Sequence, residues 1–157
     1  MKKCCIVGHR KIEESNELKA EIEKTIIELI EKGFTIFLFG SRSEFNYFCY
    51  EIVSDLKRVY PNIKRVFVRA EYPIISNDYK EYLLDSYEDT YYYSEDISAG
   101  KLSYVKRNYA MIDISDYCLF YYNDTYKLPN NTKSGTMLSY NYAVKKRKPL
   151  RNFYSSN

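Results

Sequence analysis

The chain has 157 residues and a formal net charge of +3, and 45% of its residues are hydrophobic and 29% charged. This length suits one domain, here residues 1–157, and the charged fraction argues against both a disordered chain and a membrane span. A net charge this small does not require a nucleic-acid partner, although the chain is basic.

Short buried strands alternate with amphipathic helices along the sequence. Gly33 ends the first helix, Ser43 is suited to cap the second, and Pro61 ends it. We expect strands at residues 4–7, 35–39, 64–70, 117–122 and 150–154, and helices at residues 13–32, from 43 to before 61, 102–115 and 136–147. Between residues 71 and 100 the pattern predicts a short helix at 79–84 and leaves a strand at 90–93 open.

Alternating strands and helices predict parallel pairing through right-handed crossovers. The fold class is therefore α/β, a Rossmann-like, three-layer, doubly wound domain with a mostly parallel sheet. In such folds the ligand lies beyond the carboxyl ends of the strands, near the point where the strand order reverses. We therefore expect the ligand-binding residues at that edge of the sheet.

Two segments combine glycine with arginine directly after predicted strands: Gly8-His9-Arg10 and Gly40-Ser41-Arg42-Ser43. A glycine turn that opens a helix presents free N–H groups and the positive end of the helix dipole, which suits a phosphate, and arginine adds bidentate recognition. Arg69 and the loop from Asn123 to Thr136 fall at the same edge. The simpler alternatives are glycines that only turn the chain, a loop histidine, and arginines in surface ion pairs.

The cysteines and the single histidine limit the chemistry. Cys4, Cys5, Cys49 and Cys118 form no Cys-x-x-Cys pair and mostly fall in apolar patterns, which favours buried thiols of a reducing compartment. With one histidine, a His-rich metal site is excluded, and we expect no metal and no cofactor. The amino-terminal apolar run is too short for a signal peptide, so we expect a cytoplasmic protein.

Three motifs together resemble the SLOG superfamily: Gly8-His9-Arg10, the segment Phe39–Phe45, and Ser134-Gly135-Thr136 followed by Lys148-Pro149. That superfamily includes the LONELY GUY phosphoribohydrolases, DprA-like domains and sensors of nucleotide-derived signals. The chain is most similar to small stand-alone SLOG proteins of Firmicutes and their phages. The resemblance implies a nucleotide-binding Rossmann-like domain, and it suggests a homodimer.

The LONELY GUY pattern has an arginine early in one helix, a methionine four residues later and a Gly-Thr-x-x-Glu segment. Arg107 and Met111 match the first two, and Gly135-Thr136 match the third. Nucleoside deoxyribosyltransferases share a similar Gly-Thr-x-x-Glu segment, and in both groups the catalytic glutamate corresponds to Ser139 here. A serine hydroxyl cannot replace a carboxylate in glycosidic cleavage. Glu44 and Glu71 are the alternative carboxylates.

The preferred hypothesis is therefore a non-catalytic sensor or sequestering protein for a nucleotide-derived signal, such as an ADP-ribose derivative or a cyclic nucleotide, with phage counter-defence as one role. The alternative is a nucleotide N-glycosidase, phosphoribohydrolase or deoxyribosyltransferase-like enzyme. A DprA-like nucleic-acid module would rely on exposed tyrosines and the basic run Lys145–Lys148, and we disfavour it because the net charge is low and the run suits a helix C-terminus.

The predicted ligand-binding set has no catalytic member. Tyr121 or Tyr122 is expected to stack on the base. The residues are Gly8, His9, Arg10, Gly40, Ser41, Arg42, Ser43, Arg69, Arg107, Met111, Ser134, Gly135 and Thr136.

Overall fold

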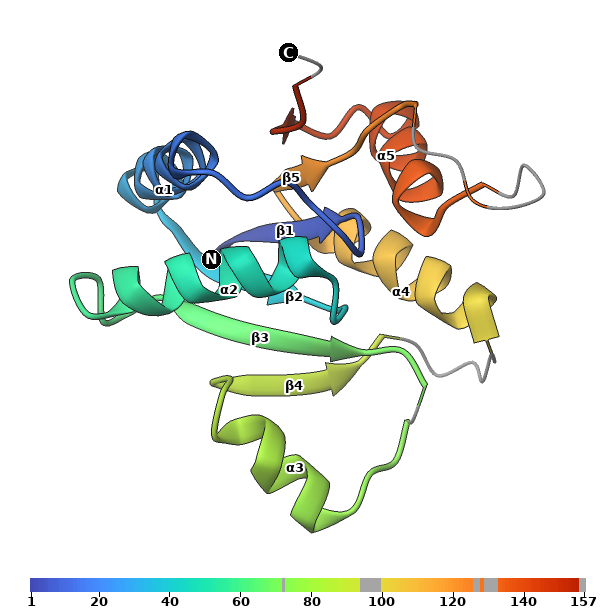
Figure 1. Cartoon of the computed structure of the whole chain (residues 1–157). Coiled ribbons are helices and arrows are strands. Elements are labelled where there is room, and N and C mark those ends of the chain that lie inside the picture. Colours follow the sequence, from blue (N-terminus) through green and yellow to red (C-terminus); the bar gives the residue numbers. More distant parts are fainter. Residues whose placement is uncertain (72, 94–99, 126–127, 129–132, 156–157) are drawn as a thin grey trace.

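Helices cover both faces of a six-stranded sheet in the computed structural model, which describes residues 1–71, 73–93, 100–125, 128 and 133–155 (Figure 1). The strands are β1 (Lys2–Gly8), β2 (Phe34–Phe39), β3 (Lys64–Arg69), β4 (Asp89–Tyr92), β5 (Tyr117–Tyr121) and β6 (Leu150–Asn152). The helices are α1 (Asn16–Glu31), α2 (Glu44–Lys57), α3 (Asn77–Leu84), α4 (Gly100–Ile114) and α5 (Gly135–Lys145).

All strand pairs in this sheet are parallel, in the order β4-β3-β2-β1-β5-β6. From β1 the chain steps outward through β2 and β3 to β4, and then returns to the other side of β1 with β5. The strand order therefore reverses between β1 and β5, where Val7 pairs with Phe120 and Gly8 with Tyr121. The predicted α/β, doubly wound fold is confirmed, and the sheet is parallel throughout.

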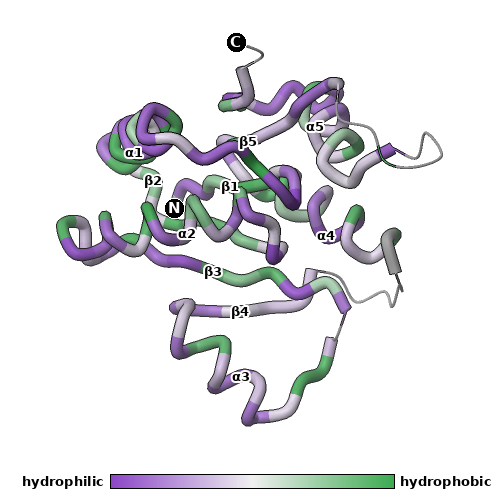
Figure 2. Tube along the Cα trace, viewed as in Figure 1, coloured by the Kyte–Doolittle hydropathy of each residue, from purple (hydrophilic) through white to green (hydrophobic). Residues whose placement is uncertain are grey.

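The core has two halves because successive strand residues point to opposite faces of the sheet. On β1, Ile6 packs with the residues of α1 and α2, whereas Val7 packs with those of α4 and α5. Figure 2 shows hydrophobic and hydrophilic residues alternating around α1, as expected for a helix that covers a sheet on one side. The four cysteines are buried and form no disulfide.

Serine side chains cap four helices. Ser15, Ser43, Ser76 and Ser134 each accept a hydrogen bond from the backbone N–H three residues further on. Gly33, which follows α1, has a φ of 97°, a conformation that favours glycine at a helix end. None of the described helices combines the length and hydropathy needed to cross a bilayer.

The segment at residues 90–93, which the sequence left open, forms the edge strand β4. It pairs with β3 over Val66–Arg69. The backbone N–H of Tyr93 continues this pairing by donating to the carbonyl of Arg69 at 3.4 Å. The carboxyl ends of β2, β3 and β4 consequently lie next to one another at one edge of the sheet.

Candidate functional site

His9 lies where the strand order reverses, directly after β1, and only 3% of it is exposed. Its backbone N–H donates to the carbonyl of Tyr121 (3.2 Å), and its Nε2 accepts from the backbone N–H of Asn123 (2.9 Å). A ring nitrogen that accepts a hydrogen bond is unprotonated, and burial lowers the pKa of this histidine. His9 therefore ties the segment after β5 to the end of β1 as a neutral ring.

Gly8 and Gly40 are needed for close packing. A Cβ at Gly8 would lie 2.3 Å from Cδ2 of Phe45, and a Cβ at Gly40 would lie 2.6 Å from Cδ of Arg107. Neither glycine has a positive φ, so the tight-turn alternative does not apply to them. Gly8 allows α2 to approach the end of β1, and Gly40 allows an arginine side chain to cross the end of β2.

Polar groups at the start of α2, one of the two predicted phosphate turns, already have hydrogen-bond partners within the protein. Asn46, which is 2% exposed, accepts from the N–H of Gly40 (3.3 Å) and donates to the carbonyl of Ile6 (3.2 Å). Ser43 Oγ accepts from the N–H of Asn46, and Ser41 Oγ bonds to Ser43 Oγ. Sequence reasoning missed Asn46, although an amide between Phe45 and Phe48 in the apolar stripe of α2 was the available signal.

The remaining predicted residues near α2 and β3 differ in exposure. Arg10 and Arg42 are exposed at the carboxyl edge. Glu44, a candidate substitute carboxylate, accepts from the backbone N–H of Ile12 at 2.8 Å and so holds the segment after β1. Arg69 donates to Thr90 Oγ1 (3.2 Å) and to the carbonyl of Pro73 (3.4 Å). Arg69 thereby fastens β3 to β4 and to the following loop.

Arg107, on α4, is a buried cation with 3% of its surface exposed. Its Nη1 donates to the carbonyl of Gly40, its Nε donates to Oδ1 of Asn108 (3.0 Å), and its guanidinium lies 5.6 Å from the ring of Tyr104. All these partners are uncharged, and no ion pair to Arg107 exists within the described residues. Burial lowers the pKa of Arg107 to about 10, so the side chain is still charged at neutral pH.

Asn108 and Ser139 connect Arg107 to the first turn of α5. Asn108 Nδ2 donates to Ser139 Oγ (3.1 Å), and Ser139 Oγ donates to the carbonyl of Gly135 (2.7 Å). Ser139 is fully buried, so its hydroxyl joins two helices. Met111, one turn after Arg107, is 1% exposed and belongs to the core half beneath α4 and α5.

The start of α5 is more open than the start of α2. Ser134 caps it by accepting from the N–H of Met137 (3.0 Å), and a Cβ at Gly135 would meet no atom within 4 Å. Among the described residues, the N–H groups of Gly135 and Thr136 have no acceptor. This helix start therefore offers donors and space together, next to the network that leads to Arg107.

The two candidate stacking tyrosines occupy different environments. Tyr121 is 7% exposed, packs its ring 5.7 Å from that of Phe45, and accepts from the N–H of Glu13 through its hydroxyl (3.3 Å). Tyr122 is half-buried, with its ring 6.0 Å from that of His9 and 4.7 Å from that of Tyr140. Tyr122 is the ring that a ligand at this edge could reach.

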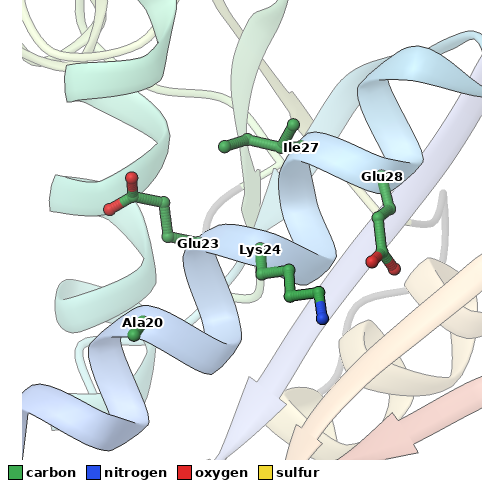
Figure 3. A pocket seen from close by; sticks show the side chains of 5 residues that line it. All are labelled: Ala20, Glu23, Lys24, Ile27 and Glu28. Carbon is green, nitrogen blue, oxygen red and sulfur yellow. The ribbon is translucent and has the colours of Figure 1, made fainter.

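One surface hollow lies away from this edge, along α1. It is lined by Ala20, Glu23, Lys24, Ile27 and Glu28, and none of these residues was predicted to bind ligand (Figure 3). Within the described ranges, no group of three or more histidine, cysteine or acidic side chains could hold a metal ion.

Comparisons with known proteins agree with this fold. The model of the YspA SLOG family matches residues 5–154. A solved structure of DNA processing protein A from Helicobacter pylori, described for its single-stranded DNA binding mode, is similar with a TM-score of 0.61 and 21% identity over 95% of this chain. The chain spans 63% of that structure's length. No curated protein sequence matches the chain.

These findings correct one expectation. We disfavoured nucleic acid as a partner because the net charge is only +3. That exclusion is wrong, since a protein of this fold is described as binding single-stranded DNA. The physical reason is that net charge averages the whole surface, whereas a single strand is held by local cations and stacking rings.

Proposed function

Because the chain belongs to the YspA SLOG family, we propose that it binds a nucleotide-derived small molecule by its phosphate and leaves it intact. Membership of this family supports a nucleotide-related binding domain. The phosphate would lie between Arg107 and the start of α5. The observation that carries the proposal is the burial of Arg107 without a carboxylate partner among the described residues.

Burying a guanidinium is costly unless an anion compensates its charge. The carbonyl of Gly40 and the amide of Asn108 satisfy two of its donors but supply no negative charge. Arginine is also the side chain best suited to phosphate, because its planar donors match two phosphate oxygens. A phosphate at Arg107 would supply the missing charge.

The start of α5 supplies the second half of such a site. The N–H groups of Gly135 and Thr136 and the positive end of the helix dipole favour an anion, and the open space at Gly135 lets it approach. The bonds from Asn108 to Ser139 and from Ser139 to Gly135 hold this turn near Arg107. Tyr122 would stack on the base at the neighbouring strand end.

Ser139 supports binding without cleavage. At the position where related enzymes have a glutamate, this chain has a buried hydroxyl that already bonds to Asn108 and to the carbonyl of Gly135. It provides no carboxylate to stabilise an oxocarbenium-like sugar. A protein that holds a nucleotide signal without consuming it acts as a sensor or a sequestering protein, and phage counter-defence is one setting for that role.

Single-stranded DNA is a second candidate ligand for the same edge. The likeness to DNA processing protein A over 95% of this chain favours it, and Tyr122 could stack on a base of DNA as well as on a free nucleotide. In that case the phosphodiester backbone would contact Arg107. Oligothymidylate therefore belongs in the binding experiment.

The experiment is a calorimetric titration against AMP, ADP-ribose, NAD, cyclic mono- and dinucleotides and oligothymidylate, followed by chromatography of each mixture. We expect stoichiometric binding of at least one nucleotide, recovery of that nucleotide unchanged, and loss of binding in Arg107→Met. Arg58→Met, at an exposed arginine after α2, is the matched control. Release of free base would contradict binding without cleavage, and binding of oligothymidylate alone would favour the second candidate.

A further inference from the structure

Two side chains at the carboxyl ends of β3 and β4 lie around Arg107, and the site as described does not use them. Glu71 follows β3, and Tyr93 follows β4. We propose that Tyr93 binds the ligand phosphate together with Arg107, and that Glu71 accepts a hydrogen bond from the ribose 2′-hydroxyl, so that the site selects ribonucleotides over 2′-deoxyribonucleotides. This inference rests on the proposed function.

The strand order brings these residues together. Arg107 reaches across to the carbonyl of Gly40 at the end of β2. β3 is the next strand in the sheet and β4 the one after it, and the N–H of Tyr93 bonds to the carbonyl of Arg69 at the end of β3. The ring of Tyr93 packs against the core half that contains Met111, one turn of α4 away from Arg107.

The hydroxyl of Tyr93 is buried and has no hydrogen-bond partner within the described ranges of the chain. A buried hydroxyl left without a partner costs free energy, and native proteins rarely leave one so unless something else binds there. Burial lowers the pKa of Arg107, and Glu71 and Tyr93 lie close enough to Arg107 to oppose that shift. The hydroxyl is therefore placed to donate to an anion that Arg107 holds.

The charge of Glu71 restricts which ligand group can lie beside that anion. It is exposed, and it forms no ion pair within the described part of the chain. An ionised carboxylate only accepts hydrogen bonds and repels phosphate, so the group that faces it must be an uncharged donor. In a nucleotide, the uncharged donors close to a phosphate are the ribose hydroxyls. Because DNA lacks the 2′-hydroxyl, Glu71 would separate the two ligand classes.

The test uses matched pairs of ligands: the four ribonucleoside monophosphates and their 2′-deoxy counterparts, titrated into the wild-type chain by calorimetry. We expect the ribonucleotide of a pair to bind about tenfold more tightly, the effect of one hydrogen bond to a charged group. Glu71→Ala should weaken ribonucleotide binding by about tenfold and leave 2′-deoxyribonucleotide binding unchanged. The exposed Glu81 on α3 gives the control variant Glu81→Ala.

Tyr93→Phe should weaken both members of a pair equally, because the phosphate is common to them. We expect the Tyr93→Phe variant to fold, since the hydroxyl that it removes has no hydrogen-bond partner among the residues that the structure describes. Tyr91→Phe is its matched control and should leave the affinity unchanged: Tyr91 lies on β4, two residues before Tyr93, and its hydroxyl is likewise buried without a partner among the described residues. Thermal unfolding of both variants checks that they are folded.

The outcomes separate this inference from the proposed function. Equal binding within each pair, with binding still lost in Arg107→Met, would overturn the role of Glu71 and leave the proposed phosphate site in place. Unchanged affinity in Tyr93→Phe would overturn the role of Tyr93. If the folded wild-type chain binds neither member of any pair, the inference is wrong; if it also binds no nucleotide of the calorimetric panel, the proposed function is wrong as well.

Discussion

Replacing Arg107 by methionine tests whether this arginine is kept for a ligand or for stability. Burial lowers the pKa of Arg107 to about 10, which at about 1.4 kcal/mol per pKa unit disfavours the charged side chain in the folded protein by about 3 kcal/mol. Because the pKa is lower in the folded state, this penalty is present at every pH below about 10. An uncharged side chain of similar length does not incur it.

The substitution also has a cost of similar size. It leaves the carbonyl of Gly40 and the amide oxygen of Asn108 without their donor, and each unsatisfied buried acceptor costs about 1–3 kcal/mol. The two effects oppose each other. We therefore expect the free energy of unfolding of the ligand-free Arg107→Met variant to differ from the wild type by no more than about 3 kcal/mol.

Urea unfolding of the ligand-free proteins measures the free energy of unfolding. Calorimetric titration with the nucleotide of the panel that binds most tightly measures the affinity. We expect affinity to fall about ten- to a hundredfold, as for a lost hydrogen bond to a charged group. Arg58→Met should change neither. A loss in unfolding free energy of more than about 3 kcal/mol, as for a broken buried ion pair, together with unchanged affinity would refute the reasoning.

Three further predictions concern the frame of the site. In Gly8→Ala the new Cβ would lie 2.3 Å from the fully buried ring of Phe45, so the urea midpoint should fall by an amount equivalent to about 1–3 kcal/mol; an unchanged midpoint would contradict this packing. Asn46→Ala removes the partners of the Gly40 N–H and the Ile6 carbonyl and should destabilise by about 2 kcal/mol or more, whereas Asn62→Ala, at an exposed position, should not. Burial lowers the pKa of His9 below its ordinary value of 6.5. The unfolded chain therefore binds the proton more tightly than the folded protein, and the free energy of unfolding should fall as the pH is lowered from about 7.5 to about 5.5. His9→Asn should flatten that dependence in unfolding curves, and because His9 is the single histidine, a flat wild-type curve would show that its ring is not held neutral.

The order of the elements could be predicted because their signals are local. Apolar periodicity marks the strands and helices, and Ser43, Ser134 and Gly33 mark helix ends through bonds to neighbouring residues. Only the edge strand at residues 90–93 was left open, since an edge strand of tyrosines has a weaker pattern than a strand buried on both faces. The parallel topology then follows from general chain-connection rules.

The candidate site was predictable only in part. The sequence pointed to the carboxyl edge of the sheet, and the resemblance singled out Arg107 and Gly135, which the proposed site uses. The sequence could not show that Asn46 already bonds to the backbone of Gly40 and Ile6 at the start of α2. Those bonds depend on how α2 packs against the sheet. Tyr93 was one tyrosine among 19 until the structure placed its buried hydroxyl beside Arg107.

By itself, therefore, the sequence determined the fold class and the strand and helix order, and it predicted the edge of the sheet at which the proposed site lies. These properties depend on residues within a few positions of one another. Tertiary structure alone decided that Arg107 is buried without a carboxylate partner among the described residues, that Ser139 joins α4 to α5, and that Glu71 lies near enough to Arg107 to influence its pKa. Those properties depend on contacts between residues more than 30 positions apart, and a local pattern carries no information about which distant groups will pair.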